Sequence, residues 1–151
     1  MRRIILFCSL LLIVSCKSKN AAIDKTISIV KTEEVAMVKK NRAEDLGKRL
    51  LETCNTSRFK TFSSVEATDQ VRQNATKEKI AKVCKKINQR NGRFIGLQLI
   101  DITYNKRTEE YIFHYNINYE KKYFKRELFV TVNAENKVSA LSTKEIKPTA
   151  F

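Results

Sequence analysis

Of the side chains in this sequence that can act as nucleophiles, metal ligands or general bases, five are cysteine or histidine. Four are the cysteines Cys8, Cys16, Cys54 and Cys84, and the fifth is His114, the single histidine. A cysteine can act as a nucleophile, form a disulfide or bind a metal ion, and a neutral imidazole can act as a general base. What each of them does depends on the sequence around it.

His114 lies between Phe113 and Tyr115, in a stretch where apolar-aromatic and polar residues alternate. Asp101, on the expected neighbouring strand, could orient the imidazole for general-base catalysis. No serine or cysteine nucleophile stands in a recognisable context, and one titratable residue is a weak sign of a site, so we favour a histidine at the surface or rim of the sheet. We therefore assign no catalytic residue and expect the protein not to be an enzyme.

Residues 1–15, MRRIILFCSLLLIVS, have the composition of a secretory signal peptide. Arg2 and Arg3 form a basic start, and Ile4 to Val14 form an apolar run that only Ser9 interrupts. A charged start, a short apolar segment and then small residues are typical of such signals. The run is shorter than the roughly 20 apolar residues that a membrane-spanning helix needs.

The four residues that end this segment, Ile-Val-Ser-Cys at 13–16, resemble the lipobox of bacterial lipoproteins. In that family an aliphatic residue lies three positions before the cysteine and a small residue lies directly before it. The resemblance implies that the Cys16 thiol is joined to diacylglycerol, that the leader is cut off before it, and that the protein is lipid-modified (palmitate). The alternative is an ordinary secreted protein with a chance cysteine at this position.

The resemblance also implies a location. Lys17 stands where an Asp retains some lipoproteins at the inner membrane, so we expect a bacterial cell-envelope protein, at the outer membrane if the organism has two membranes. The net charge of +14, which falls to +12 without Arg2 and Arg3, favours anionic partners. Because nucleic acid is not expected outside the cytoplasm, we expect an envelope protein, peptidoglycan or anionic lipid as the partner, besides the membrane itself.

Cys54 and Cys84 remain in the exported chain, and both lie on the apolar stripes of predicted helices. A disulfide between them would close a loop of about 30 residues and contribute roughly 3 to 4 kcal/mol by the loop-entropy relation. The alternative is two buried free thiols that behave as small hydrophobic side chains. Two cysteines and one distant histidine do not make a structural zinc site, so no metal or cofactor is expected.

The elements that position these residues follow from hydrophobic periodicity. We expect a signal peptide over 1–15, a lipidated tether over 16–32, in which 27–30 could form a short strand, and an α+β domain over 33–151. Apolar residues at helical spacing predict helices over 33–55 and 76–91, the second with Thr76 as N-cap, and a short helix within 65–74.

After Gly92 the pattern changes from helical to alternating. It predicts strands over 94–104, 111–120, 123–132 and 137–146. The short breaks between them favour antiparallel pairing of neighbours. The predicted fold class is therefore α+β, with two to three N-terminal helices packed on one face of a four-stranded antiparallel meander sheet.

This order, from Asp45 through TKEKIAKVCKKINQRNGRFIGLQ to VTVNAENKVSAL, resembles small envelope domains of the cystatin-like or NTF2-like kind. The resemblance implies no activity, so we expect a membrane-anchored lipoprotein with a non-enzymatic binding or structural domain. One alternative is an inhibitor of an envelope-acting hydrolase such as lysozyme, which needs a protruding loop, with 58–75 as the longest candidate. Another is a small NTF2-like pocket enzyme, which needs His114 and Asp101 at the floor of a cavity.

Aromatic and basic residues also recur along the predicted sheet. A face of this kind can bind sugars or anionic ligands, whereas tyrosines more often complete the edge of a core and lysines protect the edge of a sheet. The residues concerned are Tyr104, Tyr111, Tyr115, Tyr119, Tyr123, Lys121, Lys122, Lys125 and Arg126.

Overall fold

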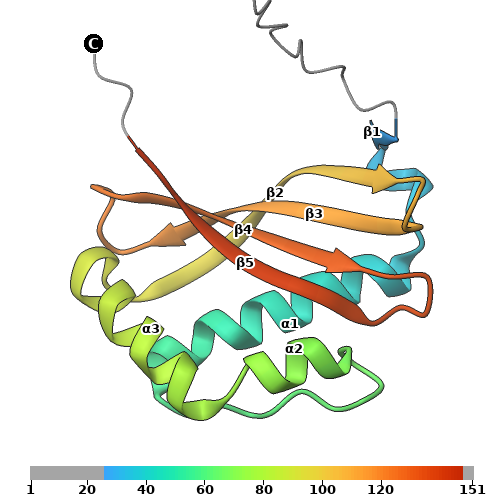
Figure 1. Ribbon diagram of the computed structural model, residues 1–151. Coiled ribbons are helices and arrows are strands. Elements are labelled where there is room, and N and C mark those ends of the chain that lie inside the picture. Colours follow the sequence, from blue (N-terminus) through green and yellow to red (C-terminus); the bar gives the residue numbers. More distant parts are fainter. Residues whose placement is uncertain (1–25, 148–151) are drawn as a thin grey trace, which may run out of the picture.

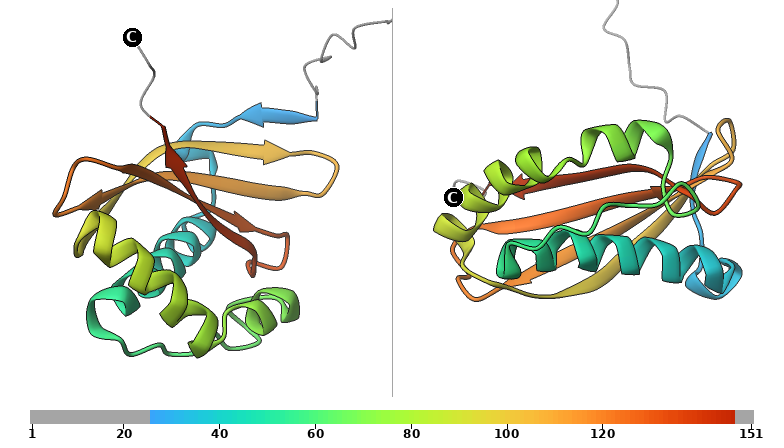
Figure 2. Two further views of the ribbon diagram at one scale, coloured as in Figure 1. Left: turned by 60° about the vertical axis from the view of Figure 1, so that its left-hand side comes forward. Right: turned by 90° about the horizontal axis from the view of Figure 1, so that it is seen from below.

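The computed structural model describes residues 26–147 and has the α+β architecture that the sequence predicts (Figure 1). A five-stranded antiparallel sheet in the order β1-β2-β3-β4-β5 carries the α-helices on one of its faces (Figures 1 and 2). The strands are β1 Ile27–Ile29, β2 Phe94–Asn105, β3 Glu110–Tyr119, β4 Lys125–Val132 and β5 Val138–Ile146. The helices are α1 Met37–Thr56, α2 Asp69–Asn74 and α3 Lys77–Asn91, and a 3-10 turn spans Thr32–Glu34.

The helix α1 begins at Met37, four residues later than predicted. The two glutamates that suggested its start belong to the 3-10 turn, and Val35 then runs in extended backbone with its side chain buried. Within α1, the apolar residues Ala43, Leu46, Leu51 and Cys54 are buried and Leu50 is partly buried, whereas Val38 is exposed. The amphipathic pattern therefore identified the helix, but it did not distinguish its first turn from the segment before it.

Helix α3 agrees closely with its prediction. Thr76 is the N-cap, and its side-chain oxygen accepts a hydrogen bond from the backbone nitrogen of Lys79 at 3.4 Å. Cys84 lies on the buried side of α3 and forms a disulfide with Cys54 of α1, with the two Cα atoms 4.8 Å apart. The cysteine pair is thus bonded, which confirms the disulfide prediction over the alternative of free thiols.

Side-chain amides join the helices to the strands. Asn55, at the end of α1, donates from Nδ2 to the carbonyl of Phe94 at 2.8 Å and accepts from the Phe94 amide at 2.9 Å. Asn91, which is fully buried, donates from Nδ2 to the carbonyl of Phe124 at 2.6 Å. These bonds fix the first residue of β2 and the approach to β4 against the ends of two helices.

The alternating pattern of the strands is confirmed. The side chains of β3 and β4 that face the helices, among them Phe113, Tyr115, Leu128 and Val130, are buried and form the centre of the core. The strand predicted from 123 begins instead at Lys125, because Tyr123 lies in the turn before it with 82% of its surface exposed.

The prediction of four strands was wrong by one. β1 pairs antiparallel with β2, with Ile27 opposite Asn105 and Ile29 opposite Thr103, and adds a fifth strand at the edge of the sheet. Its three residues are too few to show a period of two, and its partner lies more than seventy residues further along the chain. The segment assigned to the tether therefore contributes a strand to the domain.

The stretch 58–75 does not protrude. Phe62 and Val71 are buried, and residues on either side of Ala67 bond to the start of β5, with the Val138 amide donating to the Glu66 carbonyl at 2.9 Å. Arg49 of α1 holds the Glu66 carboxylate by two hydrogen bonds of 2.8 and 3.0 Å. The end of this stretch is α2, within the range predicted for a short helix.

Candidate functional site: the helix-free face of the sheet

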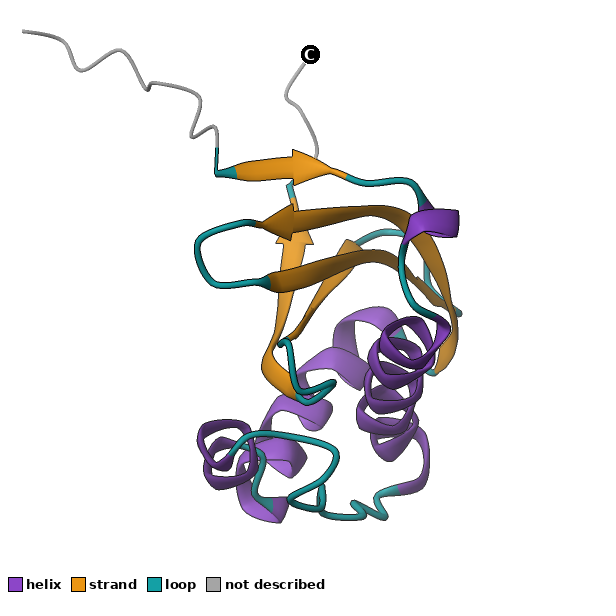
Figure 3. Cartoon of the chain, turned by 90° about the vertical axis from the view of Figure 1, so that its right-hand side faces the viewer, coloured by secondary structure: helices purple, strands orange, loops and turns teal. Residues whose placement is uncertain are grey.

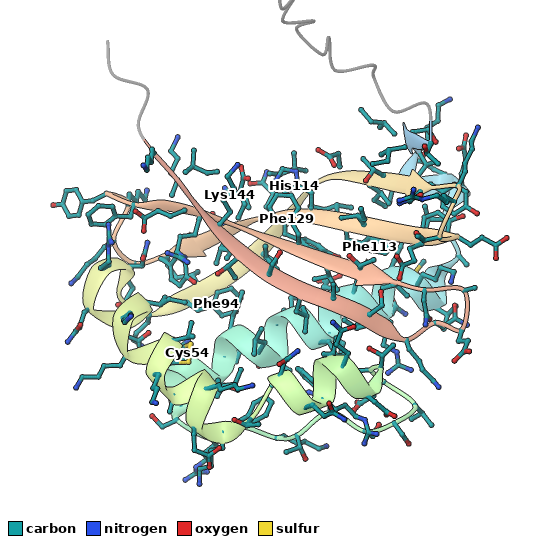
Figure 4. All side chains as sticks on the ribbon, in the orientation of Figure 1. Cys54, Phe94, Phe113, His114, Phe129 and Lys144 are labelled. Carbon is teal, nitrogen blue, oxygen red and sulfur yellow. A yellow bond between two sulfur atoms is a disulfide. The ribbon has the colours of Figure 1, made fainter. Side chains whose placement is uncertain are left out.

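The sheet has one face without α-helices, which we call the helix-free face. Its residues follow from the strand register: Asp101, His114, Phe129 and Ser142 are opposite one another across four strands, and all point away from the core. Figure 4 shows His114, Phe129 and Lys144 on this side of the sheet, with the disulfide on the other. His114 and Asp101 therefore both lie on the helix-free face.

His114 is held between two carboxylates. Its Nδ1 lies 3.1 Å from Oδ2 of Asp101, in hydrogen-bond geometry, and its Nε2 lies 3.0 Å from Oε2 of Glu127 without the alignment of a hydrogen bond. The ring stacks on Phe129 with the centroids 4.4 Å apart and the planes at 13°. Only 18% of the His114 side chain is exposed.

Local irregularity in β2 produces this arrangement. A bulge between Leu99 and Asp101 shifts the register by one residue and brings Asp101 opposite His114. Glu127 lies opposite Asn116, one diagonal step from His114 across the β3–β4 pair. Such diagonal neighbours are within reach of long side chains.

Asp101 is in hydrogen-bond contact with His114, the contact that the general-base alternative required. Because Glu127 occupies the other side of the ring, both imidazole nitrogens face carboxylates and neither is open toward a substrate. Cys54 and Cys84 are bonded to each other in the helix layer, so neither supplies a thiol to this face. These three side chains connect β2, β3 and β4, and we call them the ionic cluster because of the two carboxylates.

A groove of about 860 Å³ lies on the same face beside the cluster. It forms where the start of β2, the β3–β4 turn and the end of β5 come together, and Glu127 is part of its wall. The amides Gln98, Asn116 and Asn118 can donate and accept hydrogen bonds there. Its apolar and basic lining residues are Ile95, Leu99, Ile100, Ile117, Tyr119, Phe124, Ile146, Lys121, Lys122 and Lys125.

The positive charge around this groove is not neutralised by the protein. Lys122, Lys125 and Lys144 form no ion pair with any carboxylate among residues 26–147. The two carboxylates of the ionic cluster, Asp101 and Glu127, face His114. An anionic ligand at the groove would therefore meet ammonium groups that have no competing partner.

Exposed isoleucines gather on the helix-free face. In the described chain the isoleucines that are largely exposed are Ile29 (78%), Ile95 (67%), Ile100 (50%) and Ile27 (46%). Those of β1 are opposite residues of this face, and the other two lie at the bulges of β2 and line the groove. No exposed isoleucine of residues 26–147 lies in the helix layer.

An aromatic and cationic binding face, the less favoured of the two interpretations of these residues, is not assembled. Tyr115 and Tyr119 point into the core, and burial raises the pKa of the Tyr119 hydroxyl to about 12 and that of Tyr115 further. The rings of Tyr104 and Tyr111 contact each other, with their centroids 4.7 Å apart and their planes tilted by 37°. Tyr123 alone among the five extends into solvent, at the tip of the β3–β4 turn.

Several predictions lie beyond what the structure describes. The signal peptide, Cys16 and the first part of the tether fall outside residues 26–147. Within that range, no three His, Cys, Asp or Glu side chains gather as a metal-binding group, and no helix combines the length and apolar run needed to cross a membrane.

Comparison of the chain with protein-family models, with curated proteins and with solved structures finds no match. The evidence on function is therefore the chemistry of the chain itself. Sequence reasoning identified His114 and Asp101, but it missed Glu127 and the exposed isoleucines. Alternation along β4 points Glu127 away from the face of Phe124 and Leu128. Together with the register of β3 and β4, this alternation would have assigned Glu127 to the same face as His114.

Proposed function

We propose that this protein is a lipid-anchored, non-enzymatic binding protein of the bacterial cell envelope. Cys16 carries the anchor, and the helix-free face of the domain binds the partner. One observation supports the binding role: the exposed isoleucines of the described chain lie together on the sheet face that no helix covers. Exposed apolar side chains that share one uncovered face are typical of an interaction surface.

The partner is an envelope component: a protein, peptidoglycan or anionic lipid. Nucleic acid is not expected for an exported chain. If the organism has two membranes, Lys17 after the acylated cysteine favours the outer one. A cystatin-like or NTF2-like ancestry is compatible with this role, since neither requires a catalytic group.

Two other functions have weaker support. A hydrolase inhibitor would need a protruding loop, and 58–75 packs against α1 and β5 instead. A pocket enzyme would need His114 inside a cavity between the sheet and the helices, whereas it lies on the opposite face with carboxylates at both nitrogens.

Crosslinking in intact cells tests the proposal. A photoreactive residue in place of Ile100 probes the helix-free face, and the same residue in place of Val65, exposed in the segment below the helices, is the matched control. We expect an adduct with an envelope component from position 100, none from position 65, and loss of the adduct in Cys16→Ala.

Mass spectrometry of the native protein tests the anchor separately. We expect a mature N-terminus at Cys16 that carries fatty acids. An intact leader, or an unmodified Cys16, would overturn the anchor, and an adduct formed equally well from position 65 would overturn the assignment of the binding face.

A further inference from the structure

We infer that the helix-free face docks on the surface of an anionic lipid bilayer, with its isoleucines at the interface and its lysines on the headgroup phosphates. This inference specifies the partner of the proposed function, and it rests on the lipid anchor at Cys16 that the proposed function includes. Three independent features of the described chain support it: the position of the N-terminal strand, the apolar side chains and the uncompensated charge.

The chain enters the domain on the side of the helix-free face. Figure 3 shows β1 at the end of the molecule opposite the α-helices. Thr26 is ten positions after Cys16, and even a fully extended chain of that length spans no more than about 36 Å. An acylated Cys16 would therefore keep the domain close to the bilayer and bring its N-terminal strand, rather than its helices, nearest to the lipid.

The apolar residues of this face suit an interface more than a folded partner's core. Ile29, Ile95 and Ile100 lie at the edge strand and at two bulges of β2, so they extend from the sheet as separate side chains. Tyr123 projects from the neighbouring turn, and an aromatic ring with a polar tip is typical of the headgroup level. Such side chains can enter the outer layer of a bilayer individually.

Charge alone does not distinguish the two faces, because α3 also carries exposed lysines, among them Lys82, Lys85 and Lys86. The helix-free face combines its unpaired lysines with four exposed isoleucines, whereas the described part of α3 has a single large apolar side chain in solvent, Val83. A basic residue near an anionic surface strengthens the attraction about fivefold. Lys122, Lys125 and Lys144 together would then favour the docked state roughly a hundredfold.

The test uses a single fluorescent reporter, since the sequence contains no tryptophan. The Tyr123→Trp variant is expressed in the cell, which processes its N-terminus. It is then purified from membranes and reconstituted into vesicles. We expect the emission to shift to the blue in an equal mixture of phosphatidylcholine and phosphatidylglycerol, but not in phosphatidylcholine alone. Val65→Trp, in the segment below the helices, should not shift in either vesicle.

Charge reversals supply the matched control. Lys122→Glu, Lys125→Glu and Lys144→Glu together should abolish the shift, whereas Lys82→Glu, Lys85→Glu and Lys86→Glu together, with the same change in net charge, should leave it. Circular dichroism of both triple variants shows whether they fold as the parent does. If the first does not, the single Lys144→Glu variant should lower the docking constant about fivefold or more.

Three results would overturn the inference. One is the absence of any shift at position 123, and another is an equal shift at position 65. The third is a shift that a soluble acidic polysaccharide produces while vesicles do not, which would assign the face to a glycan. Mass spectrometry of the same sample shows whether Cys16 is acylated, so an absent shift in acylated protein is a failure of the docking face, whereas an unmodified Cys16 is a failure of the anchor.

Discussion

At the scale of single residues, Gly47 has two opposing effects on stability. A glycine in the middle of α1 costs roughly 1 kcal/mol of helix propensity relative to alanine. However, a Cβ at this position would lie 2.7 Å from Cδ2 of the fully buried Leu128 and 3.3 Å from Cδ1 of Leu97. The close approach of α1 to the sheet therefore depends on the missing side chain.

We predict that Gly47→Ala destabilises the protein by about 1 to 3 kcal/mol, the usual cost of overpacking a core, despite the better propensity of alanine. Denaturant unfolding measures the difference in the free energy of unfolding. An increase in stability would mean that Leu128 yields at little cost, and that the sheet does not require a glycine at this crossing.

Glu66 makes a contribution to stability that depends on pH. The guanidinium of Arg49, together with donors from Ser63, lowers the pKa of the Glu66 carboxyl from 4.5 to about 2. A lowered pKa in the folded state means that the contribution is complete above pH 4.5 and is lost as the pH falls from there toward 2.

We therefore expect Glu66→Gln to lower the free energy of unfolding by about 1 to 3 kcal/mol at pH 7, the range for hydrogen bonds to charged groups. The difference from the wild type should diminish below pH 4.5, where the wild-type carboxyl becomes protonated during unfolding. Urea titrations at neutral and acidic pH measure both quantities, and a difference that stays constant with pH would contradict this assignment.

At the scale of elements, the disulfide joins the two long helices. Cys54 is in the last turn of α1 and Cys84 is in the middle of α3, and the loop between them includes α2 and the segment that packs on β5. A bond that closes a loop of about 30 residues restricts the unfolded chain more than it changes the folded contacts.

Cys54→Ala combined with Cys84→Ala should lower the free energy of unfolding by roughly 3 to 4 kcal/mol. The reduced wild type should show a similar loss, because the same constraint is removed. Thermal unfolding with and without a reductant measures this effect. If reduction leaves the midpoint unchanged, the pairing does not persist in solution.

The sequence predicted most of the elements because their signals are local. The 3.6-residue period and the N-cap of α3, and the period of two in β2 to β5, are visible within ten to fifteen residues. β1 was not predicted as part of the sheet, since its strand state depends on pairing with the far end of β2. Val38 and Val65 are apolar residues within the ranges predicted as helical, yet both are exposed, because periodicity cannot show where a helix or loop extends beyond its neighbours.

The candidate site was predictable only in part for the same reason. Alternation placed His114 on one face and Asp101 on the neighbouring strand, and the pair is formed. The contact with Glu127 depends on the register of β3 with β4, and the exposure of Ile100 depends on a bulge in β2. Register and bulges are properties of pairs of strands, so they cannot be predicted from the sequence of one strand alone.

At the scale of the whole molecule, one face of the sheet forms the hydrophobic core and the other is open to solvent. The helices and the segment 58–75 cover one face, and the core formed there includes the large apolar side chains that are fully buried. The other face is stabilised only by its cross-strand contacts, chiefly the cluster around His114. Substitutions on the two faces should therefore separate stability from binding.

Two isoleucines of β2, only two residues apart, provide the comparison. Ile102 is 1% exposed in the core, and Ile100 is 50% exposed on the helix-free face. Ile102→Ser should destabilise the domain by about 2 to 5 kcal/mol, because it leaves a cavity and buries a hydroxyl. Ile100→Ser should change stability by no more than about 0.5 kcal/mol, as is usual for a surface position.

In binding to the envelope, the exposed isoleucines should matter although they contribute little to stability. The triple variant Ile29→Ser, Ile95→Ser and Ile100→Ser removes the most exposed isoleucines of the helix-free face. Envelope crosslinks from a photoreactive residue in place of Tyr123 should therefore decrease. The melting temperature should stay near that of the wild type. The loss should be larger than that of a triple serine variant at Met37, Val65 and Val83, which are equally exposed apolar residues outside this face. Equal losses in both variants would mean that general surface hydrophobicity, and not this face, determines contact with the envelope.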